Sequence, residues 1–267
     1  MYGLSSWASR LVLAIPVCLL WTACTAIPTP NVPPAMTEPP PRQEDALPRQ
    51  ATPSVPAVAE GAQPEVESST FYDRALSAFP EAPQVSQGQV LLLYGLVTDR
   101  AGVPLPGIAV EIWQTDANGV YNHPSDPSTA GRDLSFQFFG TAVTDDAGVY
   151  IFRTIVPGRY EPRPRHIHVK VKEAGRELLT TQFYFAADQD EVQREQIFRA
   201  ASGRGDMLYV ALVPATDPWG RPVLLGRRDI VLDRGAGELA PTPSQAEGPY
   251  YPVVDVSGYD NDLTRLP

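Results

Sequence analysis

The fold is indicated by a β-prone run and the turn that ends it: Gln89-Val90-Leu91-Leu92-Leu93-Tyr94-Gly95-Leu96-Val97, then Asp99-Arg100-Ala101-Gly102. Apolar and aromatic runs that stop at Asp and Gly clusters are typical of short strands. The pattern recurs, and further strands are expected at 108–113, 136–143, 149–153, 166–171, 178–185, 207–212 and 230–232. Short strands at this spacing predict an all-β fold, an antiparallel β-sandwich or barrel with long loops and at most one or two short helices, one of them over 190–201.

The composition limits the functions that the chain can have. Its 267 residues carry a net charge of −10, from 21 basic and 31 acidic side chains. Nucleic-acid binding needs clustered Lys and Arg, whereas the only lysines here are Lys170 and Lys172, so we expect no nucleic-acid partner. Both cysteines, Cys18 and Cys24, lie near the N-terminus. Any metal in the body of the chain must therefore be held by nitrogen and oxygen ligands.

Residues 1–26 have the pattern of a signal peptide. An apolar run from Leu11 to Trp21 follows Arg10 and ends in the small-residue stretch Thr22-Ala23-Cys24-Thr25-Ala26. The run is too short to span a bilayer and suits an export signal. Cys24 is similar to the lipidated cysteine of a bacterial lipoprotein, and cleavage after Ala26 is the alternative. We expect an exported, extracytoplasmic protein that is either secreted or anchored to the cell surface through a lipid on Cys24.

The region from 27 to 86 is predicted to be a proline-rich tether. It contains few large apolar side chains, so it cannot bury enough surface to offset the entropy of ordering. A short apolar stretch from Phe71 to Phe79 is the exception, and a helical turn that docks on the domain is expected there. One domain should then occupy residues 87–267.

His166-Ile167-His168 is a candidate for half of a metal site. Side chains two apart leave the same face of a strand, so both imidazoles can reach one point. A structural histidine pair is the alternative. The oxygen donors near this tripeptide and in the preceding loop include Tyr160 and Tyr121. Phenolate ligands need a strongly Lewis-acidic cation, and ferric iron accepts both phenolate and imidazole.

Several sequence blocks resemble the intradiol ring-cleavage dioxygenases, and within them the branch of the protocatechuate 3,4-dioxygenase β-subunit. The similarity runs over about residues 88–233. The blocks are Glu111-Ile112-Trp113-Gln114-Thr115-Asp116, Gly119-Val120-Tyr121-Asn122-His123-Pro124, Arg163-Pro164-Arg165-His166-Ile167-His168 and Leu179-Thr180-Thr181-Gln182-Phe183-Tyr184-Phe185. The resemblance implies a sandwich with a prealbumin/transthyretin-like core.

The resemblance also implies a site and a reaction. Fe(3+) would be bound by Tyr121, Tyr160, His166 and His168, while Arg163 lies against the substrate and Gln182 supports the same region. Tyr160 would leave the metal when substrate binds and accept a proton. The implied substrates are a catechol-type aromatic diol and O2, and the product is a cis,cis-muconate-type diacid. His123 matches the family loop and is interpreted as structural.

The C-terminal segment 239–267 departs from the order usual in that family. Ala246-Glu247-Gly248-Pro249-Tyr250-Tyr251 is similar to a block that precedes the first strand in many family members. We predict that this segment is permuted and folds back beside the first strand, in cis or on a neighbouring subunit, with Gly248, Pro249 and Tyr250 lining the substrate pocket. A detached tail is the alternative. Family members associate through this segment, so the oligomeric state, including a homo-oligomer, stays open.

Two further interpretations belong to other classes of function. The turn pattern of residues 99–110 is shared with transthyretin-like binding modules that have no catalytic activity. The histidine pair could also hold copper or zinc. If the substrate carries a carboxylate, Arg165 and Arg159 are the candidates to bind it.

Overall fold

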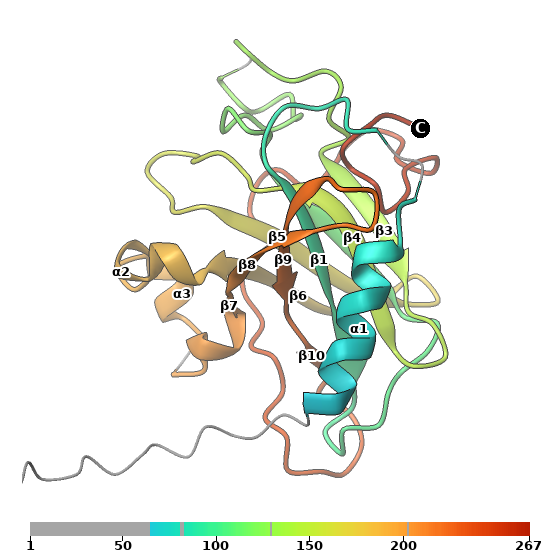
Figure 1. The fold of residues 1–267 in the computed structure, drawn as a ribbon. Coiled ribbons are helices and arrows are strands. Elements are labelled where there is room, and N and C mark those ends of the chain that lie inside the picture. The colour runs from blue at the N-terminus through green and yellow to red at the C-terminus, as the bar shows by residue number, and fades with distance from the viewer. Residues whose placement is uncertain (1–64, 81–82, 129, 202) are drawn as a thin grey trace, which may run out of the picture. The chain divides into compact units, whose positions relative to one another are not determined.

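The computed structural model describes residues 65–80, 83–128, 130–201 and 203–267 (Figure 1). The predicted signal peptide, Cys24 and the predicted tether as far as residue 64 lie outside the described residues. Within the described part of the chain, no helix has both the length and the apolar character needed to cross a bilayer.

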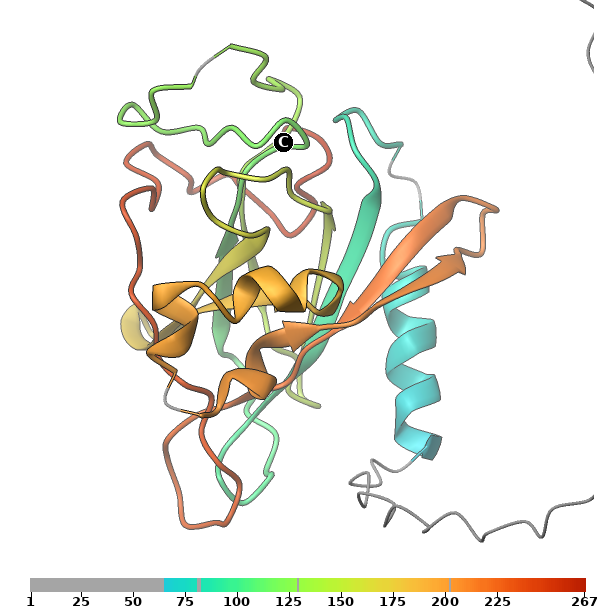
Figure 2. The ribbon, with the colours of Figure 1, turned by 90° about the vertical axis from the view of Figure 1, so that its left-hand side faces the viewer.

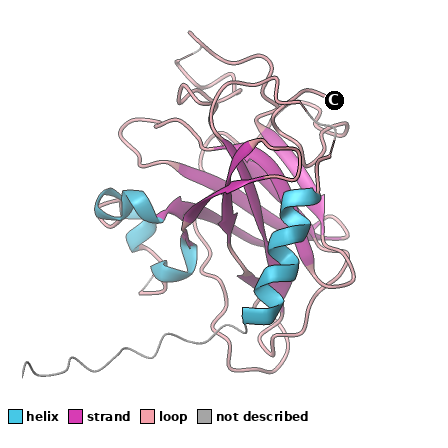
Figure 3. Cartoon of the chain, in the orientation of Figure 1, coloured by secondary structure: helices cyan, strands magenta, loops and turns pink. Residues whose placement is uncertain are grey.

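The first sheet is built around β1 (Val90–Thr98). β4 (Val149–Ile155) pairs with it in antiparallel orientation, and β9 (Pro222–Arg227) and β10 (Ile230–Val231) pair with it in parallel. β8 (Leu212–Thr216) extends the sheet through β9. Figure 3 shows the strands in magenta at the centre of the fold.

The second sheet has the order β3-β2-β5-β6-β7. Its strands are β2 (Ala109–Trp113), β3 (Phe139–Val143), β5 (His166–Glu173), β6 (Arg176–Phe185) and β7 (Tyr209–Val210). β2, β3, β5 and β6 pair in antiparallel orientation, whereas β7 runs parallel to β6.

The main core lies between the two sheets. Alternate residues point to opposite faces of a strand, so Val110 and Ile112 of β2 and Ile167 and Val169 of β5 face this core and are fully buried. Leu91 and Leu93 of β1 meet them from the other sheet. The residues between them on β2 and β5 point away from the core, and the candidate site lies on that outer face.

The all-β prediction is confirmed, but a purely antiparallel sandwich is wrong. Both sheets are mixed, because β9 and β10 run parallel to β1 and β7 runs parallel to β6. β8 and β9 include residues outside the predicted strands, and the direction of a strand depends on partners far away in sequence.

The helical content is also larger than predicted. The described residues form three α-helices, α1 (Glu65–Ser77), α2 (Gln189–Val192) and α3 (Gln196–Arg199), and the 3-10 helices Ala186–Asp188 and Gly205–Leu208. The single helix expected over 190–201 is therefore two short helices with a break between them.

Helix α1 lies in the stretch predicted as a tether and extends the helical turn expected near Phe71. It packs on the outer face of the first sheet, where Ala75 and Phe71 contact a cluster that includes Leu92 and Leu225. Arg74 also forms an ion pair with Asp145. This part of the chain is thus attached to the domain, and Figure 2 shows α1 beside β1 and the β8–β9 hairpin.

The C-terminal segment 239–267 packs on the same domain, away from α1 (Figure 2). Gln245 N donates to Thr180 O at 2.8 Å, and Leu263 N donates to Arg153 O at 2.7 Å. Leu263 itself is fully buried in the main core. The segment therefore crosses from β6 to β4 and covers the outer face of the second sheet.

Candidate functional site

Strand β5 presents the histidine pair on the outer face of the second sheet. His166 and His168 are 3 % and 1 % exposed, and Ile167 between them faces the core. The antiparallel register places His168 opposite Trp113 on one side and Gln182 on the other. Both imidazoles are therefore held by the sheet.

Three donor atoms converge above this face. Tyr121 Oη lies 3.1 Å from His166 Nε2 and 3.0 Å from His168 Nε2, and the two Nε2 atoms are 3.1 Å apart. Nδ1 of His166 donates to the Pro164 carbonyl at 2.7 Å, which leaves the lone pair of Nε2 facing the other donors.

Burial keeps all three side chains uncharged. It lowers the pKa of His166 to about 3, with a further contribution from the Arg163 cation. It also holds the pKa of His168 well below its usual range. Burial raises the pKa of the Tyr121 phenol, and the opposing effect of Arg163 is smaller. The imidazoles are thus unprotonated, and Tyr121 would ionise only beside a strong cation.

The loops that carry Tyr121 and Tyr160 are held together through two glycines. A Cβ on Gly158 would lie 2.3 Å from Gly119 N, and a Cβ on Gly119 would lie 2.0 Å from Arg159 O. Asp116 adds to this contact, because its carbonyl accepts from Gly158 N and its carboxylate accepts from Val120 N. The close backbone contact brings the Tyr121 and Tyr160 rings to 5.4 Å, edge to face.

Tyr160 is the most accessible of the four predicted ligands, and its hydroxyl hydrogen-bonds to that of Tyr250. Burial, together with this contact, raises the pKa of Tyr160 to about 12. The Tyr250 ring also packs against that of Tyr121, with centroids 4.7 Å apart and planes tilted by 35°. The C-terminal segment thus supplies a direct partner to the Tyr160 hydroxyl.

Arg163 and Gln182 form a hydrogen-bonded pair at the edge of the donor group. Nη2 of Arg163 donates to Oε1 of Gln182 at 2.6 Å, and Nη1 donates to His166 Nε2 at 3.0 Å. Nε2 of Gln182 donates to the Ala246 carbonyl at 2.8 Å. Gln182 therefore connects the Arg163 guanidinium to the C-terminal segment.

Gly248 lies against the His168 ring, and a Cβ there would be 3.2 Å from His168 Cε1 at a backbone φ of +80°. Its neighbour Pro249 is exposed. Trp113 stacks on the same imidazole, with centroids 4.7 Å apart and planes 9° apart. His168 is thus confined by an indole and by the C-terminal backbone.

A partly buried polar network fixes the C-terminal segment beside the site. Lys170 forms an ion pair with Glu247 and lies over the Tyr251 ring, 3.8 Å from its centroid. The Tyr251 hydroxyl donates to Glu111 at 2.8 Å and accepts from Lys172 at 2.9 Å. The two lysines follow His168 on the same face of β5, so this network holds the segment directly next to the histidine pair.

Sequence reasoning did not single out Trp113, the lysine pair or Glu111 as parts of the site. The signal was present for the lysines, because Lys170 and Lys172 continue the two-residue period of His166 and His168 along β5. Glu111 and Trp113 have the same spacing on β2. Their contacts with β5 depend on the register between the strands.

Three other residues lie near the site in different roles. His123 accepts a hydrogen bond from Ser125 N at Nδ1, and its ring packs 5.4 Å from that of Tyr250. Arg159 forms hydrogen bonds to both carboxylate oxygens of Glu191, and Arg165 does the same with Asp188. Both arginines proposed for a substrate carboxylate are thus already paired.

The residues present fit a ferric ion. Donors bound to one cation at about 2.1 Å lie about 3 Å apart when their bonds are near right angles, as these three donors do. A cation bound there would use the converging lone pairs of Tyr121 Oη and the two Nε2 atoms. Phenolate oxygen and imidazole nitrogen are donors that ferric iron accepts.

The chain matches known proteins of one kind. A family model described as dioxygenase matches residues 64–210, and the sequence is 36% identical over 149 residues to the catechol 1,2-dioxygenase of Acinetobacter baylyi, covering 49% of this chain and 45% of that protein. It is 38% identical over 109 residues to the protocatechuate 3,4-dioxygenase beta chain of Burkholderia cepacia, covering 38% and 46%. The chain thus spans about half the length of the relatives it matches.

Among solved structures, the dioxygenase domain of a carbohydrate-binding fusion from Streptomyces sp. SirexAA-E is 32% identical with a TM-score of 0.42, covering 58% of this chain and 86% of that one. The dioxygenase family model covers more than half of the 267 residues, including Tyr121, Tyr160 and the histidine pair. This chain therefore belongs to the intradiol ring-cleavage dioxygenase family.

Proposed function

We propose that this chain is a non-haem iron(III) intradiol dioxygenase that cleaves a catechol-type ring between its two hydroxylated carbons. One ring carbon–carbon bond breaks, both atoms of O2 enter the product, and a cis,cis-muconate-type diacid results. The observation that carries the proposal is the convergence of Tyr121 Oη, His166 Nε2 and His168 Nε2 within 3.1 Å of one another in a member of this family.

Tyr121, His166 and His168 would hold the iron, with Tyr160 as the fourth ligand. Ferric iron there would supply the Lewis acidity that lets both oxygens of the diol bind in deprotonated form near neutral pH. The chain contributes a rigid, buried donor set whose imidazoles stay unprotonated. Trp113 and Gly248 keep the His168 ring in place on two sides.

Tyr160 is suited to accept a proton from the substrate. With a pKa of about 12, Tyr160 would be ionised only as a metal ligand, and its oxygen would hold a proton near neutral pH when free of the metal. The Tyr250 hydroxyl is positioned to hydrogen-bond to the Tyr160 hydroxyl and keep it in place.

Arg163 is suited to stabilise negative charge that develops on the ring. It is permanently cationic, and Nη1 faces the donor group through His166. Gln182 accepts a hydrogen bond from the other terminal nitrogen of the guanidinium, Nη2. Since Arg159 and Arg165 are each paired with a carboxylate, the arrangement favours a catechol whose ring carries no carboxylate.

The test is oxygen uptake and absorption by the protein reconstituted with ferric iron. We expect a red-brown colour from phenolate-to-iron charge transfer, a change in that colour on adding catechol, and faster oxygen uptake with catechol than with protocatechuate. Tyr121→Phe should remove most of the colour. A folded protein that binds no iron, or binds it and takes up no oxygen with catechols, would contradict the proposal.

The two alternatives from the sequence are less well supported. A transthyretin-like binding module gives no reason for the convergence of two imidazoles and a phenol in a buried position. Within residues 65–80, 83–128, 130–201 and 203–267, no group of three or more His, Cys, Asp or Glu could hold a metal. The histidine pair therefore finds its further donors among tyrosines, which favours ferric iron over copper or zinc.

A further inference from the structure

Glu195 carries a largely buried carboxylate that contacts Arg163. It belongs to none of the sequence motifs described above. Its side chain is 10 % exposed and that of Arg163 is 18 % exposed. Nε of Arg163 donates directly to Oε1 of Glu195. A buried carboxylate is costly unless it is paired and hydrogen-bonded, so this pair holds both side chains in one geometry.

Each of the three guanidinium nitrogens of Arg163 donates to a neighbouring side chain. Nε donates to Glu195, Nη2 to Gln182 at 2.6 Å and Nη1 to His166 at 3.0 Å. A guanidinium is a planar fork, so contacts to Nε and Nη2 fix the direction of Nη1. Glu195 is the partner that brings a full opposite charge to this cation.

The backbone around Glu195 is itself fixed. Glu195 N donates to Val192 O at 3.0 Å, and Arg199 N donates to Glu195 O at 3.1 Å. Val192 and Phe198, on either side, are buried in a cluster with Tyr184 of β6. The break between α2 and α3 therefore places the carboxylate at a defined position beside the strand that carries Gln182.

We propose that Glu195 is a positioning residue, which holds the Arg163 guanidinium with Nη1 directed at the donor group, where negative charge develops on the substrate. The inference rests on the proposed function, because that charge is what gives the orientation a role. Glu195 does not contact the four predicted ligands itself. Its effect on the reaction passes through Arg163.

The first test compares Glu195→Gln with Glu191→Gln in the iron-loaded protein. Glu191 lies in the same helical region, and its carboxylate pairs with the exposed Arg159. We expect Glu195→Gln to lower kcat roughly 10- to 100-fold, with KM, iron content and the charge-transfer band unchanged, since Arg163 acts on charge formed after substrate binds. Glu191→Gln should behave like the wild-type protein.

The second test is a double-mutant cycle with Arg163→Gln. If Glu195 acts through Arg163, Glu195→Gln should cause no further loss of kcat in that background. The melting temperature gives a readout that needs no turnover. Glu195→Gln should lower it in the wild-type background and raise it beside Arg163→Gln, where the carboxylate would otherwise be buried without its partner.

The outcomes separate this inference from the proposed function. If the wild-type protein is active, either of two results would overturn the positioning role and leave the dioxygenase proposal standing. One is an unchanged kcat in Glu195→Gln, and the other is losses of kcat that add across the cycle. An iron-loaded wild-type protein without ring cleavage would overturn the proposed function, and the positioning role with it.

Discussion

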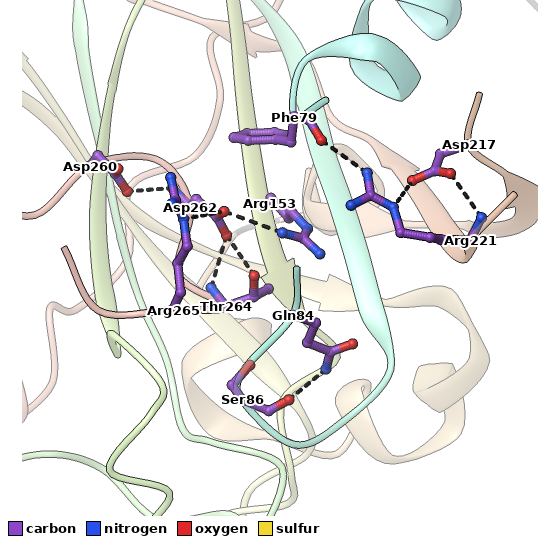
Figure 4. A network of polar contacts seen from close by, with 10 residues as sticks. All are labelled: Phe79, Gln84, Ser86, Arg153, Asp217, Arg221, Asp260, Asp262, Thr264 and Arg265. Atoms are coloured by element: carbon purple, nitrogen blue, oxygen red, sulfur yellow. Dashed lines mark hydrogen bonds and ion pairs between the residues drawn. The ribbon is translucent and has the colours of Figure 1, made fainter. Parts of the chain in front are cut away.

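Asp262 anchors the C-terminal segment through a buried ion pair. Asp262 is 1 % exposed and Arg153 is 3 % exposed, with Oδ2 and Nη1 3.3 Å apart. The same carboxylate accepts hydrogen bonds from Thr264 and Arg265, as Figure 4 shows. Burial lowers the pKa of Arg153, and the Asp262 charge opposes that shift. Arg153 therefore depends on Asp262 as its hydrogen-bonded counter-charge.

Asp262→Asn should reduce the free energy of unfolding by about 3–5 kcal/mol, because it leaves Arg153 buried without a counter-charge. Chemical denaturation at neutral pH measures this loss. Asp233→Asn is the matched control, since Asp233 is 75% exposed and lies 3.7 Å from Arg100, and it should change stability little. Equal effects of the two substitutions would show that the buried pair contributes nothing particular.

At the level of single residues, local pattern found the donor atoms that converge at the candidate site and missed residues that hold them in place. The spacing of His166 and His168 on a strand, with the motifs around Tyr121 and Arg163, led to side chains that the fold brings together. Glu195 could not be found in this way. Its contact with Arg163 joins residues 32 positions apart. The contact depends on where α2 ends and α3 begins, and the local sequence pattern does not predict that break.

At the level of elements, strand existence was easier to predict than strand direction. Alternation and Asp/Gly turns located β1 to β6 to within a few residues. β9 was missed, because Pro222 at its start and Gly226 within it are both unusual in strands. Its parallel pairing with β1 joins residues more than 130 positions apart, which periodicity cannot show.

The turn of the β8–β9 hairpin contacts the chain just after α1. Asp217 accepts from Arg221 N at 2.9 Å and pairs with the Arg221 side chain, which donates to the Phe79 carbonyl at 2.9 Å (Figure 4). Burial raises the pKa of Asp217, but the hydrogen bonds and charge of Arg221 outweigh it, and the net shift is downward. The folded hairpin therefore favours the ionised carboxylate.

This shift predicts an acid-sensitive contribution to stability. A carboxylate whose pKa is lower in the folded state stabilises that state when the pH is above the pKa of the unfolded chain, about 3.9. This contribution is lost as the pH falls through the pKa of the folded state. The wild-type protein should exceed Asp217→Asn in free energy of unfolding from pH 6 to about 4, and the difference should shrink below that. Denaturation curves at several pH values measure it, with Asp190→Asn of α2 as the control. A difference that stays constant to pH 3 would contradict the assignment.

At the level of the whole molecule, the segment 239–267 completes the domain rather than trailing from it. It supplies Leu263 to the core, Asp262 to Arg153 and Tyr250 to Tyr160. Thr264 O accepts from Val85 N and Ser86 N at 3.1 and 2.9 Å, so the end of the segment lies beside the start of the first strand. These contacts agree with the predicted fold-back beside the first strand, and the permutation of the family order stays a prediction.

Ending the chain at Gly237 should therefore give a protein that is insoluble or lacks a cooperative melting transition and retains no iron. The physical reason is that the main core opens and Arg153 loses its counter-charge. Ending the chain at Arg265 removes only exposed residues and is the control, which should match the full chain. A soluble Gly237 truncation with normal iron content and turnover would rule out this role for the segment.

We further propose that the protein is exported and anchored through Cys24, as the N-terminal pattern predicts. Cys24→Ser should move it from the membrane fraction to the soluble extracytoplasmic fraction and remove incorporation of labelled fatty acid. Cys18→Ser tests whether the other cysteine has the same effect, and it should not. Unchanged fractionation of Cys24→Ser would favour cleavage after Ala26 instead.

The position of Tyr250 beyond the last strand has a consequence for how the protein matures. Strand β5 carries the histidine pair and ends at Glu173, whereas Tyr250 follows β10. The strand is therefore synthesised before the residues that cover it. The histidine pair therefore remains open on one side until the segment that carries Tyr250 has been synthesised and has packed. Iron that enters before then would meet an uncovered site, so the stable holoprotein is expected to assemble only after this segment has packed.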